Sequence, residues 1–120
     1  MNKIFFSALF FLFSTMSYAG DKSPFLITPH YKIFIDEHCS EYDIACNNVT
    51  YTSVNKKTGV TLTLKGATIN VGPSQDFRGY DFPNGEYLYR LIPSDKDSSR
   101  WELLVMKKGH VLLQESGTGG

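Results

Sequence analysis

The stretch Val60-Thr61-Leu62-Thr63-Leu64-Lys65 decides the fold class of this chain. Its apolar side chains recur at every second position, and the polar side chains between them fall on the opposite face, as in a strand with one buried face. The preceding segment 49–54 is rich in β-branched and aromatic residues, and residues 55–59 supply turn chemistry that ends in a glycine. Together the two segments predict an antiparallel hairpin.

The same period of two continues on both sides of this hairpin. Further strands are expected where apolar residues alternate between turn signals, at residues 31–35, 67–71, 77–82, 86–92, 100–106 and 110–114. A short helical turn fits residues 40–44, but no stretch after the first nineteen residues shows a helical period of sufficient length. About seven strands separated by frequent turn signals predict an all-β fold, a small antiparallel barrel or sandwich.

The N-terminal residues have the layout of a secretory signal peptide. Lys3 gives the first residues a positive charge, an apolar run follows over residues 4–13, and Ser17-Tyr18-Ala19 puts small residues ahead of a cut before Gly20. The apolar run is about ten residues long, whereas a helix needs about twenty to cross the hydrocarbon core of a membrane. We therefore predict a cleaved signal peptide over residues 1–19, no permanent membrane anchor, and a location in the periplasm or outside the cell.

Residues 20–120 have the usual size of one domain, and we expect a single all-β domain. The small residues 116–120 have nothing to bury, which predicts a flexible tail. The whole chain has twelve basic and twelve acidic residues, so removal of Lys3 with the signal peptide leaves a net charge of about −1. This balance argues against a nucleic-acid partner, which favours a basic stripe.

Cys39 and Cys46 are the only cysteines of the chain, and export would place them where disulfides persist. In the chain-entropy model a ring of this size stabilises a fold by about 2.5 kcal/mol. A zinc site that adds histidines is the alternative, but the C-x6-C spacing matches no standard finger and oxidation would remove both thiolates. We therefore predict a disulfide, with no metal ion and no cofactor.

The segment 36–43 concentrates four carboxylates and one imidazole in eight residues. It fits a solvated loop, a contact surface for a partner, or a cation site. Calcium is disfavoured because the segment lacks the regular alternation and the central glycine of an EF-hand loop. The carboxylates that we assign to partner binding are those of Asp36, Glu37, Glu41 and Asp43.

A second candidate surface lies in residues 76–101, which are rich in tyrosine and arginine. These residue types are enriched at the hot spots of interfaces, but the core of a β-sheet uses the same aromatics. We expect Tyr87, Tyr89 and Trp101 to fill the core. Arg78 and Tyr80, which flank a glycine, are expected to be exposed and to take part in recognition.

Common catalytic templates are missing from the chain: it contains no G-x-S-x-G, no H-E-x-x-H and no G-x-x-x-x-G-K-[ST]. In its size, its export signal and its cysteine pair it resembles small periplasmic binding and inhibitor proteins, including those that block lysozymes. This resemblance concerns architecture and compartment. The two candidate surfaces, on a scaffold without a recognisable catalytic set, indicate a non-catalytic protein that binds a protein or another macromolecule of the cell envelope.

Two other function classes stay open at this point. A hydrolase of the cell envelope could use His38 or His110 with nearby carboxylates, because histidine titrates near neutral pH. An envelope assembly subunit could instead offer an edge strand to another chain.

Overall fold

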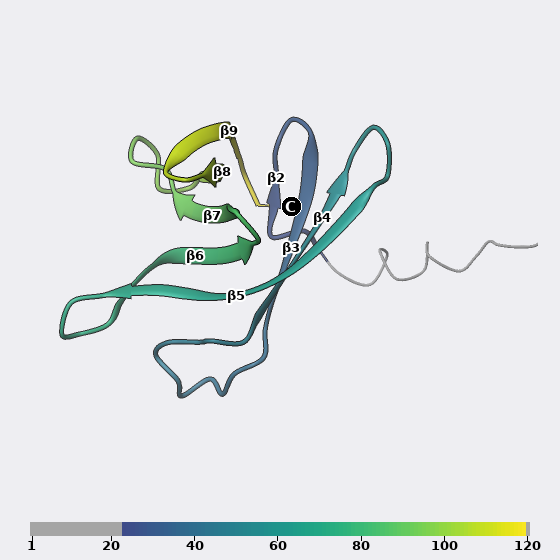
Figure 1. Ribbon diagram of the computed structural model, residues 1–120. Helices are drawn as coiled ribbons and strands as arrows, with labels where there is room; N and C mark the ends of the chain where they lie inside the picture. Colours follow the sequence, from purple (N-terminus) through teal and green to yellow (C-terminus); the bar gives the residue numbers. More distant parts are fainter. Residues whose placement is uncertain (1–22, 120) are drawn as a thin grey trace, which may run out of the picture.

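The computed structural model describes residues 23–119, which form one antiparallel sheet of eight strands (Figure 1). In chain order the strands are β2 (Leu26–Ile27), β3 (Tyr31–Glu37), β4 (Val49–Asn55), β5 (Thr61–Val71), β6 (Asp76–Asn84), β7 (Tyr87–Pro93), β8 (Trp101–Lys107) and β9 (His110–Gly117). Each strand pairs with the next one along the chain. The predicted all-β fold is therefore confirmed, while the predicted signal peptide, residues 1–19, lies outside the described residues.

The long strand β5 belongs to both halves of the sheet. Its residues 61–66 pair with β4, and its residues 67–71 pair with β6. The sequence suggested two separate strands here, and the structure joins them through Gly66. A Cβ atom at Gly66 would lie 2.0 Å from the carbonyl oxygen of Asp81, so the close approach of β6 requires a glycine.

The outer strands β2 and β9 meet at a seam that nearly closes the sheet into a barrel. The Ile27 N–H donates to the carbonyl oxygen of Thr118 at 2.9 Å, and the two residues form an antiparallel bridge. Ser116 and Gly117 are the last residues of β9. Residues 116–118 of the predicted flexible tail therefore lie at the edge of the sheet, where a backbone hydrogen bond crosses the seam although the segment has little side chain to bury.

The core lies between the two halves of the sheet. Its most deeply buried large side chains come from six different strands and are those of Leu26, Ile33, Val49, Tyr51, Phe82, Leu91 and Leu103. In β5 the predicted inward face is confirmed at Leu64, which is 8% exposed, whereas Val60 precedes the strand and is 66% exposed. Within residues 23–119 the structure contains no helix long and apolar enough to pass through a membrane.

Candidate functional site

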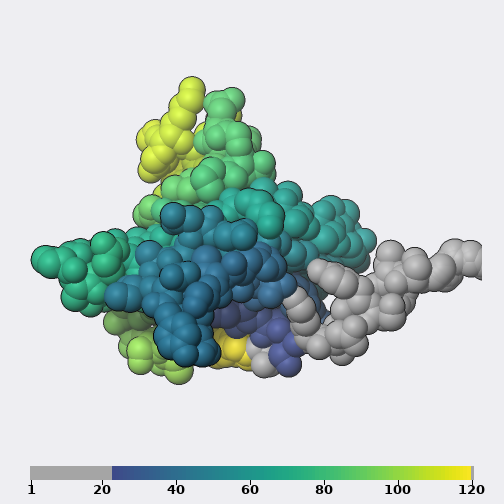
Figure 2. Space-filling view, turned by 90° about the horizontal axis from the view of Figure 1, so that it is seen from below, coloured from purple at the N-terminus to yellow at the C-terminus, as the bar shows by residue number. Residues whose placement is uncertain are grey.

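Residues 38–48 connect β3 to β4, and we call them the disulfide loop. Cys39 and Cys46 are joined by a disulfide with their Cα atoms 5.9 Å apart, which confirms the predicted pairing. In place of the short helical turn that residues 40–44 would fit, the loop has a tighter turn, in which the Asp43 N–H donates to the Ser40 carbonyl oxygen at 3.0 Å. The loop extends from the lower side of the sheet in Figure 1, and Figure 2 views that face directly.

The disulfide loop is held against the second half of β5. The Cys46 N–H donates to the Thr68 hydroxyl at 2.9 Å, and the Thr68 N–H donates to the Cys46 carbonyl oxygen at 2.8 Å. A longer bond of 3.4 Å runs from the Asn70 side-chain amide to the Ile44 carbonyl oxygen. Because these contacts and the disulfide fix the backbone, the loop would lose little conformational entropy on binding a partner.

The loop presents two large apolar side chains to solvent. Tyr42 is 87% exposed and Ile44 is 69% exposed. The exposed carboxylates of Glu41 and Asp43 flank Tyr42. Sequence reasoning found the acidic residues but missed Tyr42 and Ile44, although an apolar residue next to acids inside a short cysteine ring was the available signal.

The four carboxylates that we assigned to partner binding do not form one cluster. Asp36 is half-buried in β3, and Glu37 ends that strand, whereas Glu41 and Asp43 lie out on the disulfide loop. In the part of the chain that the structure describes, no group of three or more His, Cys, Asp and Glu side chains is placed to hold a metal ion.

Tyr80 was predicted to be exposed, and this prediction is wrong. Tyr80 is 5% exposed, and its ring packs against those of Phe25, Phe77 and Trp101 at centroid distances of 5.8, 5.2 and 6.3 Å. Its hydroxyl donates to the Glu37 carboxylate at 2.6 Å. Burial, and then this hydrogen bond, raise the pKa of Tyr80 well above its ordinary value, so the phenol stays a neutral donor.

A bulge in β6 explains why Tyr80 and Arg78 differ. Ile69 pairs with Gly79 and the next residue, Asn70, pairs with Phe77, so Arg78 is the extra residue of the bulge. The Arg78 side chain is 59% exposed, as predicted, and its guanidinium lies 3.7 Å from the Asp76 carboxylate. The structure therefore joins Tyr80 to Glu37 and leaves Arg78 in a separate surface pair.

Of the three aromatic residues that we assigned to the core, two pack against it and one does not. Tyr89 and Trp101 are half-buried and pack against it. Tyr87 is 39% exposed, with the Lys107 ammonium 5.4 Å from the centre of its ring. It lies at the start of β7, next to the turn between β6 and β7, where the core ends.

The three histidines have different surroundings. The His38 ring lies 3.0 Å from the Thr50 hydroxyl, which also accepts a hydrogen bond from Lys65 at 2.9 Å. His110 is exposed at the start of β9. In contrast, the His30 ring contacts the carboxylate of Glu115.

Glu115 links β9 to the turn between β2 and β3. Its side chain is 7% exposed and accepts hydrogen bonds from the His30 ring and from the His30 N–H, the latter at 3.2 Å. Burial would raise the pKa of Glu115, but the hydrogen bonds from His30 and Thr28 outweigh it and hold that pKa below its usual range. This buried carboxylate thus helps to hold β9 against the turn between β2 and β3, at the seam of the sheet.

Comparison of the chain with models of protein families, with curated proteins and with solved structures finds no match in any of the three.

Proposed function

We propose that the protein is an exported, non-catalytic binding protein that contacts a macromolecular partner through its disulfide loop. The observation that carries this proposal is the exposure of Tyr42 and Ile44, 87% and 69%, on a loop that is fixed by a disulfide and by hydrogen bonds to β5. An exposed apolar pair on a constrained loop favours association, because burying it removes apolar surface from water without a large ordering cost.

The proposed location is the periplasm or the outside of the cell. The disulfide is compatible with an oxidising compartment, where such bonds persist. The N-terminal pattern in residues 1–19 supports export followed by cleavage.

The chemistry of the loop defines the kind of partner that fits it. Tyrosine buries a large area with few rotatable bonds and keeps a hydroxyl for a polar contact. Glu41 and Asp43 are exposed on either side of Tyr42. We therefore infer a protein or another envelope macromolecule with an apolar pocket that accepts Tyr42 and with basic groups at its rim.

The test is affinity capture from envelope extract with the immobilised protein and two double variants. Tyr42→Ala/Ile44→Ala is expected to lose the specific partner, and Glu41→Lys/Asp43→Lys is expected to weaken it at low salt. The matched control is Val111→Ala/Leu112→Ala, since these apolar residues of β9 are 52% and 59% exposed and lie outside the loop. Equal capture by the Tyr42/Ile44 variant and the control would refute the proposal.

A further inference from the structure

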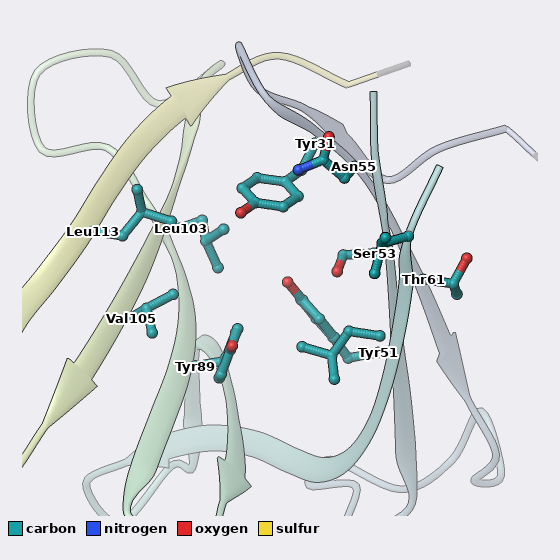
Figure 3. A pocket seen from close by; sticks show the side chains of 11 residues that line it. Tyr31, Tyr51, Ser53, Asn55, Thr61, Tyr89, Leu103, Val105 and Leu113 are labelled. Carbon is teal, nitrogen blue, oxygen red and sulfur yellow. The ribbon is translucent and has the colours of Figure 1, made fainter. Parts of the chain in front are cut away.

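A cavity of about 560 Å³ lies between the two halves of the sheet. One wall is formed by β3, β4 and the start of β5, and the other by β7, β8 and β9 (Figure 3). Tyr51, Ser53 and Leu103 in its lining are 1%, 4% and 1% exposed, whereas Val60 is 66% exposed. The cavity therefore runs from an open mouth to a buried floor, and its volume suits a small molecule, for which sites of roughly 300 to 1,000 Å³ are usual.

The polar atoms of the cavity come mainly from the wall built by β3 and β4. The hydroxyls of Tyr31, Tyr51 and Ser53 point into the space (Figure 3). Burial raises the pKa of Tyr51 well above its ordinary value, so its hydroxyl stays neutral. Each of these hydroxyls can donate one hydrogen bond and can also accept hydrogen bonds. The buried floor of the cavity therefore offers hydroxyl groups to a polar atom that enters it.

The facing wall is mainly aliphatic and contributes Leu103, Val105 and Leu113. None of the eleven described residues that line the cavity carries a charge. An ionic ligand would lose its hydration there without gaining a counter-charge, and a sugar would leave hydroxyls unpaired against the aliphatic wall. The lining favours a neutral molecule with an apolar body and one polar group.

We propose that this cavity binds a small neutral amphiphile, a molecule with an aliphatic or aromatic body and a single hydroxyl or carbonyl group. The body would pack against Leu103 and Leu113, and the polar group would bond with Tyr51 or Ser53. The cavity lies inside the sheet and shares no residue with the disulfide loop. The proposal of a ligand site and the proposal of a macromolecular contact can therefore be refuted independently of each other.

A pair of fluorescent probes tests the proposal with the purified protein. N-phenyl-1-naphthylamine is neutral, and 1-anilinonaphthalene-8-sulfonate is the same ring system with one added negative charge. The neutral probe is expected to bind saturably, with one probe per chain, and to be displaced by 1-decanol. The sulfonate is expected to bind at least about tenfold more weakly, because the lining offers it no positive charge.

Two neighbouring residues of β9 provide matched variants. Leu113 lines the cavity, whereas Leu112 is outside its lining and 59% exposed. Leu113→Trp is expected to fill the cavity and to weaken binding of the neutral probe by at least about tenfold, while Leu112→Trp adds the same volume outside and leaves binding unchanged. Ser53→Ala is expected to weaken displacement by 1-decanol by about fivefold, because one hydroxyl is lost.

Circular dichroism first establishes that each variant keeps its fold. If Leu113→Trp unfolds the protein, Val60→Trp at the exposed mouth replaces it, with exposed Lys57→Trp as its control. The proposal is overturned if the neutral probe shows no saturable binding, if both probes bind equally well, or if the folded cavity variant binds as tightly as its control.

Discussion

The Tyr80 hydroxyl donates a 2.6 Å hydrogen bond to the carboxylate of Glu37, and this contact connects the aromatic core to the end of β3, where the disulfide loop begins. The phenol lies among packed rings, whereas the carboxylate belongs to an exposed residue. Tyr80, a residue of the core, thereby helps to position Glu37, which leads into the disulfide loop.

Tyr80→Phe should remove this hydrogen bond while it keeps the packed ring. The free energy of unfolding is expected to fall by about 1 to 2 kcal/mol, since the acceptor is a carboxylate that can be hydrated again. Denaturant titration followed by Trp101 fluorescence measures the change. Arg78→Ala, on the same strand but at an exposed position, should change the stability by less than about 0.5 kcal/mol. Equal effects of the two substitutions would contradict the structural role of Tyr80.

The disulfide should stabilise the fold through the eight-residue ring that it closes. The Cys39→Ser/Cys46→Ser variant is expected to lose about 2.5 kcal/mol of unfolding free energy, because its unfolded chain regains the entropy of the open loop. Denaturant titration of the variant and of the wild-type protein, with and without reductant, measures this loss. Reductant should leave the variant unchanged, and a wild-type protein insensitive to full reduction would contradict the prediction.

The strands could be predicted because their pattern is local. Alternation such as that of residues 60–65 needs no knowledge of distant contacts, and residues 55–59 between two such segments define a hairpin. The disulfide could be predicted as well, since two cysteines in a chain with a predicted export signal allow one pairing. These local features were sufficient to predict the all-β fold and the position of the disulfide loop.

The sequence was less informative where long-range contacts decide the outcome. Burial of Tyr80 depends on the bulge at Arg78, and the place of residues 116–118 at the edge of the sheet depends on a strand about ninety residues earlier in the chain. The cavity is built from segments of β3, β4, β5, β7, β8 and β9, so no single stretch of sequence reveals it. Its tyrosines have the same alternating pattern as tyrosines that fill a core.

The seam between β2 and β9 should depend on glycine at position 117. A Cβ atom there would lie 1.8 Å from the carbonyl oxygen of Ile27. To relieve this clash, β2 would have to move away and break the bridge between Ile27 and Thr118. Gly117→Ala is expected to cost about 2 kcal/mol or more and to expose the Ile27 amide to hydrogen exchange. At Gly119 the nearest contact of an added Cβ atom is an ordinary 3.7 Å, so Gly119→Ala is the matched control. Unchanged protection in Gly117→Ala would show that the seam does not need this close approach.

Glu115 should make the seam sensitive to acid. Its pKa is held below the usual range when the protein is folded, so the folded state binds fewer protons than the unfolded chain near that pKa. The contribution of Glu115 to the free energy of unfolding is therefore complete above the pKa of the unfolded chain, about 4.3. It is lost as the pH falls through the lower pKa of the folded state. Glu115→Gln is expected to cost about 2 kcal/mol at pH 7, where a buried charged acceptor is replaced by a neutral one.

The decisive measurement is the difference in unfolding free energy between wild type and Glu115→Gln, followed from pH 7 to pH 3. Other carboxylates, including exposed Asp97, titrate in both proteins, so their contributions largely cancel in this difference. The difference should be constant down to about pH 5 and then shrink, because protonation turns the wild-type carboxylate into a neutral group like the amide. A difference that grows on acidification would mean that protonation of Glu115 favours the folded state, and the hydrogen bonds from His30 would then not stabilise its charged form.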